Sequence, residues 1–154
     1  MPLLKFEQGE FKSVIAEPLN ELALSDWLEN PVKADAATAL VVPNDVDVET
    51  LDRAINSFGA IILEMPKFTD GRAFSQARLL RQRFDYTGEI RARGEILWDQ
   101  VSFLVRCGVD GFDVSETTKK NIDAALKEFS FVYQTSADGA TPVWNIRSKH
   151  SAAA

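Results

Sequence analysis

The sequence AIILEMPKFTDGRAFSQARLLRQRFDYTGEIRARG, residues 60–94, decides the fold. It predicts a short apolar strand over residues 60–64, a polar turn, a helix and a second strand over residues 89–93. Pro66 ends the first strand, because proline cannot donate a hydrogen bond to a sheet ladder. The helix is predicted from apolar residues that recur at spacings of four, three and four, and Gly88 is expected to end it. Those apolar residues are Ala73, Ala77, Leu80 and Phe84.

Arginine is concentrated in the same stretch, although the whole chain carries a formal net charge of -6. Between residues 72 and 93 the only acidic residues are Asp85 and Glu89. The arginines are Arg72, Arg78, Arg81, Arg83, Arg91 and Arg93.

Strands alternate with helices through the rest of the chain. Further strands are predicted at residues 39–42, 109–114 and 130–134, and further apolar helix faces within residues 51–58, 97–105 and 122–129. Gly108 is expected to close the helix that precedes it. The Asp138-Gly139 pair predicts a turn into an antiparallel strand over residues 141–146.

This alternation indicates an α/β protein with a mainly parallel sheet of about five strands and helices packed on it. The sheet is an open sheet or a partial barrel, since a closed eight-stranded barrel needs about 250 residues. The antiparallel edge is placed at the C-terminus.

One domain is expected from a chain of 154 residues. Residues 1–37 are interpreted as a hairpin, with a helical turn around Trp27, that covers one sheet edge. Residues 38–147 form the single α/β domain, and residues 148–154 a flexible tail. Trp27, Trp98 and Trp144 are interpreted as packing residues.

Composition narrows the function classes. A pI near 4.8 disfavours non-specific nucleic-acid binding, which depends on neutralising phosphates. No signal peptide and no apolar run of the roughly 20 residues that span a membrane are seen, so a cytoplasmic protein is expected.

The single cysteine, Cys107, is predicted to be a buried and inert thiol. His150 has no histidine or cysteine partner, so no metal site is predicted. The glycine patterns that bind ATP or NAD are absent, and the identity of any cofactor stays open.

A candidate anion site lies where the parallel strands end, because ligands of open α/β sheets bind beyond the carboxyl ends of the strands. Arginine forks and free helix N–H groups suit oxyanions such as sulfate or sulfite. Arg72 and Arg91 are expected to reach the same space, and Thr69 or Asp70 to cap the helix. The candidate ligand-binding residues are Lys67, Thr69, Asp70, Arg72, Arg91 and Arg93.

Structural explanations stand beside this site. Ion pairs with Glu64, Asp70 or Asp99 explain its basic residues equally well. Arg78, Arg81 and Arg83 fit a solvated helix surface, so that Arg81→Ala is expected to change neither anion affinity nor folding.

The run PKFTDGRAFSQARLLRQRFDYTGEIRARGEILWDQVSFLVRCGVDGFDV, residues 66–114, resembles an uncharacterised bacterial family. The resemblance includes the preceding VPNDVDVETLDRAINSFGAIILEM and the later EFSFVYQ, and so spans about residues 38–134. Members of that family are commonly described as oxidoreductases involved in sulfite reduction. They are encoded beside the sulfite reductase haemoprotein and other enzymes of sulfate assimilation.

Two functions from different classes follow. The first is a non-catalytic accessory protein that binds an oxyanion, sulfite reductase or another sulfate-assimilation enzyme. The second is a small oxidoreductase or other enzyme that uses Glu64 or Asp113 as acid or base, with arginines as clamps.

Overall fold

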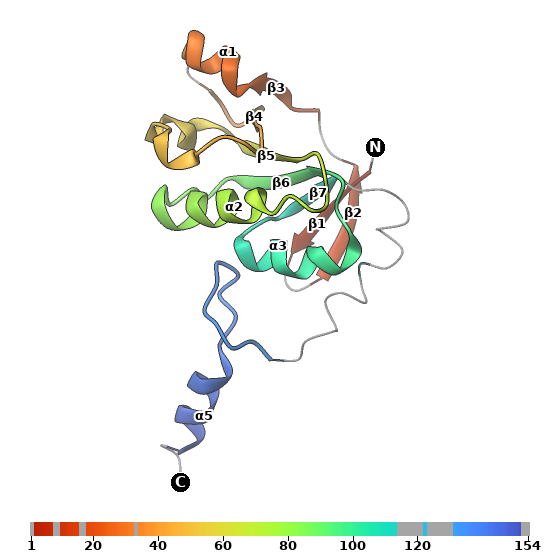
Figure 1. Cartoon of the computed structure of the whole chain (residues 1–154), viewed down its shortest axis with the longest axis vertical. Helices are drawn as coiled ribbons and strands as arrows, with labels where there is room; N and C mark the ends of the chain where they lie inside the picture. The colour runs from red at the N-terminus through yellow and green to blue at the C-terminus, as the bar shows by residue number, and fades with distance from the viewer. Residues whose placement is uncertain are drawn as a thin grey trace.

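The structure is a computed structural model that describes residues 2–7, 10–15, 18–32, 34–113, 122 and 131–151. Within them the chain forms one seven-stranded sheet in the order β2-β1-β7-β6-β5-β4-β3 (Figure 1). Its strands are β1 (Pro2–Glu7), β2 (Glu10–Ile15), β3 (Asn20–Ala23), β4 (Thr38–Val42), β5 (Ala60–Met65), β6 (Glu89–Gly94) and β7 (Gly111–Asp113).

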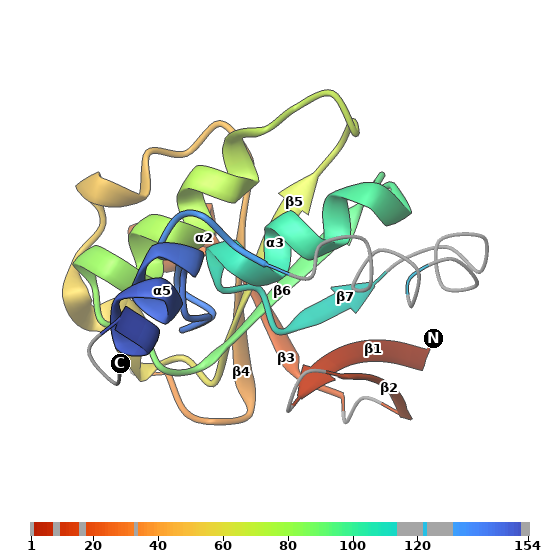
Figure 2. The ribbon, with the colours of Figure 1, turned by 90° about the horizontal axis from the view of Figure 1, so that it is seen from below.

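The sheet is mainly parallel and is not closed, which confirms the predicted fold class. Strands β3 to β6 each run parallel to the next strand in the chain. Strand β1 lies antiparallel to β7 and to β2, so the antiparallel edge belongs to the N-terminal hairpin. Figure 2 shows β1 and β2 side by side at that edge. The predicted hairpin is therefore present, and it extends the sheet in place of covering an edge.

Helical segments pack on one face of the sheet and bury one apolar core. They are α1 (Leu24–Glu29), α2 (Arg72–Arg83), α3 (Val101–Cys107) and the 3-10 turns η1 (Val48–Thr50), η2 (Arg53–Ser57) and η3 (Trp98–Gln100). In Figure 1, α2 and α3 lie in front of β6 and β7. The core takes the alternate strand residues that point to this side, among them Leu40, Ile61, Leu63, Ile90, Ala92 and Phe112.

The opposite face of the sheet, called here the open face, carries a smaller apolar cluster of Ala39, Ala60 and Ile62. Successive strand residues point to opposite faces. Because Ile90 and Ala92 point into the core, Glu89, Arg91 and Arg93 of β6 point to the open face.

The helix predicted within residues 51–58 is wrong, since η1 ends just before this segment and the 3-10 turn η2 lies within it. Asp47 and Asp52 each accept a hydrogen bond from a backbone N–H two residues later, which favours tight turns over a continuous helix. Ile55 and Phe58 are nevertheless buried, so the apolar pattern identified core residues correctly.

The predicted apolar face of α2 is confirmed, because Ala73, Ala77, Leu80 and Phe84 are all buried. The helix ends at Arg83 and not at Gly88. Asp85 follows it with a φ of 52°, a left-handed conformation that breaks the helix.

Gly108 closes α3 as predicted, with a φ of 103°, and its N–H donates to the carbonyls of Leu104 and Val105. Leu97 lies before η3 and is exposed, so it does not belong to the buried helix face.

The two strands predicted near the C-terminus are wrong. Residues 131–134 form no strand, and residues 141–146 lead into α5 (Val143–Ser151). Pro142 lacks a backbone N–H, which suits the start of a helix and not an antiparallel strand. The helix predicted within residues 122–129 lies outside the described residues except for the buried Ile122, and Val114 also lies outside them.

Candidate functional site

The loop after β5 is held at the carboxyl end of the sheet by Asp70. Its carboxylate accepts hydrogen bonds from the backbone N–H of Arg72 at 3.1 Å and from the guanidinium of Arg72, with Nη2 and Oδ2 2.6 Å apart. It also accepts one from Nδ2 of Asn44, in the loop after β4, at 2.5 Å. Hydrogen bonds from Arg72 hold the pKa of Asp70 well below its usual value. Asp70 therefore ties two neighbouring strand-end loops together.

Gly71, and not Thr69 or Asp70, is the N-cap residue of α2, and it makes no side-chain cap. Asp70, one residue earlier, nevertheless accepts the N–H of Arg72, the first residue of the helix, as the prediction for Asp70 requires. Lys67 and Thr69 are exposed. In the described part of the chain neither makes an ion pair or a side-chain hydrogen bond.

Arg91 and Arg93 lie on the open face, each paired with carboxylates. Nε of Arg91 donates to Glu89 Oε1 at 2.5 Å, and Lys5 Nζ lies 2.8 Å from the other oxygen of Glu89. Burial of Glu89 opposes ionisation, but hydrogen bonds from Arg91 and Lys5 outweigh it and lower the pKa of Glu89.

Arg93 forms a bidentate pair with Glu21 of β3, at 2.5 and 2.9 Å, and its Nε lies 3.6 Å from Asp113 Oδ2. The hydrogen bonds from Arg93 lower the pKa of Glu21. Glu64, Arg93 and Asp113 are in register on three neighbouring strands. Both carboxylates proposed from the sequence as acid or base therefore flank this arginine.

The structure does not bring Arg72 and Arg91 together. Arg72 begins α2 on the helical side of the sheet, whereas Arg91 points to the open face. The candidate residues therefore separate into a loop group and a face group. Sequence reasoning placed both at strand ends but did not use the alternation within β6. The loop group is Lys67, Thr69, Asp70 and Arg72, and the face group is Arg91 and Arg93.

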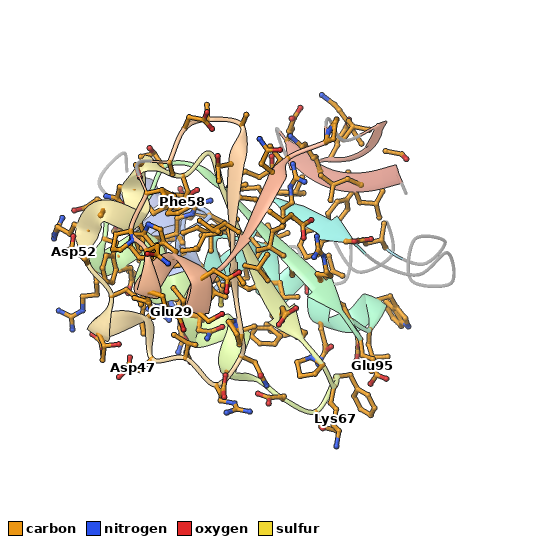
Figure 3. All side chains as sticks on the ribbon, turned by 90° about the horizontal axis from the view of Figure 1, so that it is seen from above. Glu29, Asp47, Asp52, Phe58, Lys67 and Glu95 are labelled. Carbon is orange, nitrogen blue, oxygen red and sulfur yellow. The ribbon has the colours of Figure 1, made fainter. Side chains whose placement is uncertain are left out.

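An apolar surface at the same end of the sheet was missed by the sequence analysis. Phe68, Leu97 and Trp98 expose 45%, 42% and 39% of their surfaces. Nε2 of Gln100 donates to the carbonyl of Phe68 at 2.8 Å and so joins the loops after β5 and β6. Figure 3 shows Lys67 and Glu95, next to these residues in the chain, at one edge of the molecule. We call Phe68, Leu97 and Trp98 the strand-end patch.

The sequence ILW, residues 96–98, begins two residues after the end of β6, where a loop does not require apolar residues. This run could have indicated the patch from the sequence alone. Of the three tryptophans interpreted as packing residues, Trp27 is buried against Phe58, but Trp98 and Trp144 are exposed.

Arg81 is not a surface residue, contrary to the sequence interpretation. Its side chain is 17% exposed and its guanidinium makes five hydrogen bonds. The acceptors are the carbonyls of Tyr86, Gly88 and Gly108 and the carboxylate of Asp110, at 2.5 Å. Arg81 thereby joins α2 to the loops that lead into β6 and β7.

A cavity of about 680 Å³ lies beside Arg81, at the amino ends of β6 and β7. The residues that line this cavity include Lys5, Tyr86, Glu89, Asp110 and Asp138. Burial raises the pKa of Asp110, and the hydrogen bond from the N–H of Ile90 and the charge of Arg81 oppose this shift. This is the end of the sheet opposite the predicted site.

Cys107 is partly buried, and burial raises the pKa of its thiol despite the nearby charges of Arg78 and Arg106. Among the described residues, no group of three or more histidine, cysteine, aspartate or glutamate side chains could hold a metal ion. In that same part of the chain, no helix is long and apolar enough to cross a membrane.

These features define an α/β protein with an open, mainly parallel sheet, helices on one face, paired charges on the other and apolar side chains at the strand ends. The chain belongs to the family described as "Bacterial protein of unknown function (DUF934)", whose family model matches residues 39–144. No curated protein and no solved structure matches it significantly.

Proposed function

We propose that this protein is a non-catalytic accessory protein of assimilatory sulfate and sulfite reduction in the cytoplasm. It binds sulfite reductase or another sulfate-assimilation enzyme through the strand-end patch. The observation that carries this proposal is the exposure of Phe68, Leu97 and Trp98 at the end of the sheet where ligands of α/β proteins bind. The resemblance to a family encoded beside sulfite reductase supplies the class of partner.

The arrangement of the arginines favours a protein over a free oxyanion as the ligand. Arg72, Arg91 and Arg93 each already bind a carboxylate of the chain. An incoming sulfite would have to displace these carboxylates and leave them without a cation. A partner protein needs no such exchange, because aromatic side chains such as Trp98 often dominate the binding energy of protein interfaces.

The test is a calorimetric titration of the purified sulfite reductase haemoprotein into the wild-type protein, Trp98→Ala and Leu28→Ala. Leu28 is a matched control, since it is an apolar residue of α1 with 57% of its surface exposed. We expect Trp98→Ala to bind at least about tenfold more weakly and Leu28→Ala to bind as the wild type does. Failure of the wild type to bind the haemoprotein or any other enzyme of sulfate assimilation overturns the proposal.

A parallel titration with sulfite tests the oxyanion alternative. Binding by the wild type that is lost in Arg72→Ala would assign the site to an anion instead of a protein.

The enzyme hypothesis is kept as a second candidate because Glu64, Arg93 and Asp113 are aligned across β5, β6 and β7. An anionic substrate that displaced Glu21 from Arg93 would lie beside two carboxylates that can act as acid or base. Turnover of sulfite with an electron donor, lost in both Glu64→Gln and Asp113→Asn, would favour this candidate. Flavin or haem absorbance in the purified protein would support it independently.

A further inference from the structure

The C-terminal arm, residues 131–151, is fixed to the body of the protein at its base. Arg106 at the end of α3 donates to the carbonyl of Gln134 at 2.7 Å, and its own carbonyl accepts hydrogen bonds from the N–H of Ala137 and the hydroxyl of Ser136. Nη1 of Arg106 lies 3.7 Å from Asp138. These contacts attach residues 134–138 of the arm to the C-terminal end of α3.

The residues before and after this base bind each other and expose large aromatic side chains. The N–H of Val143 donates to the carbonyl of Val132 at 2.8 Å, and Nε1 of Trp144 donates to the carbonyl of Tyr133 at 3.1 Å. Phe131, Tyr133 and Trp144 are 68%, 77% and 53% exposed. Figure 1 shows α5 projecting away from the sheet. The arm therefore presents aromatic surface that the described part of its own chain does not cover.

The helical part of the arm carries local positive charge, although the whole chain has a formal net charge of -6. The α5 sequence VWNIRSKHS contains two basic residues and no acidic one. The surroundings of the strand-end patch are net negative in the chain, since the exposed Glu95 and Asp99 flank Leu97 and Trp98, against one exposed basic residue, Lys67, beside Phe68. Apolar side chains and opposite charges thus occur on two separate surfaces of one chain.

We propose that the C-terminal arm of one copy of this protein docks on the strand-end patch of a second copy. The arm contacts α3 at the C-terminal end of the helix, whereas Leu97 and Trp98 of the patch precede its N-terminal end, so the two surfaces lie at opposite ends of α3. Each copy has one arm and one patch, and a two-fold dimer that exchanges arms satisfies both. The aromatic side chains supply the apolar contact, and Arg147 faces the acidic residues that flank Trp98.

This inference does not depend on the proposed function, although it has a consequence for it. A second copy and a partner enzyme compete for the strand-end patch, so the dimer is the form that the protein takes without its partner.

The test is the molar mass of the purified full chain, measured by light scattering at several concentrations without any partner enzyme. We expect a wild-type mass of twice 17.1 kDa. Trp144→Ala and Trp98→Ala should each weaken self-association at least tenfold, while Leu28→Ala should not change it. Circular dichroism and thermal melting verify that each variant is folded.

Mixing the two tryptophan variants separates this contact from others. Trp144→Ala retains an intact patch and Trp98→Ala an intact arm, so the mixture should recover dimer that neither variant forms alone. A monomeric wild type overturns the proposal. A Trp98→Ala variant that dimerises as the wild type does also overturns it, because the arm would then contact something other than the strand-end patch.

Discussion

Arg81 gives the sharpest prediction, because the sequence and the structure disagree about it. Replacing Arg81 with alanine removes five hydrogen bonds. It leaves three carbonyls without the donor they have in the wild type, and the Asp110 carboxylate keeps the N–H of Ile90 but loses the guanidinium. Removing one partner of a buried ion pair costs about 3–5 kcal/mol. The Asp110 side chain is 44% exposed, so water replaces part of the loss. We therefore expect Arg81→Ala to lower the free energy of unfolding by about 3 kcal/mol.

Urea unfolding followed by circular dichroism measures this change, with Arg83→Ala as the matched control. Arg83 lies two residues away on α2, is 70% exposed and lies 3.7 Å from Glu49, so its loss should cost less than about 1 kcal/mol. The effect of Arg81→Ala should shrink as the pH falls and Asp110 takes up a proton. Surface substitutions usually change the free energy of unfolding by no more than about 0.5 kcal/mol. If the free energies of unfolding of Arg81→Ala and Arg83→Ala differ by less than this amount, the structural role of Arg81 is refuted.

Three further predictions concern neighbouring residues. Gly108→Ala should destabilise the protein by about 2 kcal/mol in the same urea assay, because φ is 103° and the new Cβ would meet Cγ of Arg81 at 2.5 Å. The lowered pKa of Glu89 stabilises the fold above its usual value of 4.5, and this stabilisation is lost as the pH falls through the folded-state pKa. Thermal melts from about pH 6 to about pH 3 should therefore show a steeper loss for the wild type than for Glu89→Gln. The thiol of Cys107 should react with a thiol reagent on the order of tenfold more slowly in the native protein than in urea, and equal rates would contradict its partial burial.

The central part of the fold was predictable because its signals are local. The strand around Ile61, the apolar face of α2 and the glycine cap of α3 each follow from residues within one or two turns of each other. The sequence could not place β3 in the sheet, because its four residues NELA lack a strand pattern and their place depends on pairing with β4. The predicted strand over residues 141–146 failed because a short apolar run suits a helix as well as a strand.

The strand-end position of the candidate residues could be predicted from the sequence, but most of their ion pairs could not. Asp70 and Arg72 were both named from the sequence, and the structure joins them in an ion pair. The pair between Arg93 and Glu21 spans two intervening strands, and a sequence without known strand order does not reveal it. The role of Arg81 was missed because its acceptors are mostly backbone carbonyls. Every residue has a backbone carbonyl, so the amino-acid sequence does not indicate which ones accept a hydrogen bond from a side chain.

The order of the strands also determines when each part of the sheet can assemble. From β3 to β7 every strand pairs with its successor, so a growing chain can add each one to an existing edge. The N-terminal hairpin differs, because Lys5 pairs with Gly111 and the loop that this contact closes contains most of the chain. Closing so long a loop carries a large entropic cost until β7 is in place. Strand β1 is therefore synthesised long before β7, the strand it pairs with, and one of its edges stays unpaired until the rest of the sheet is made.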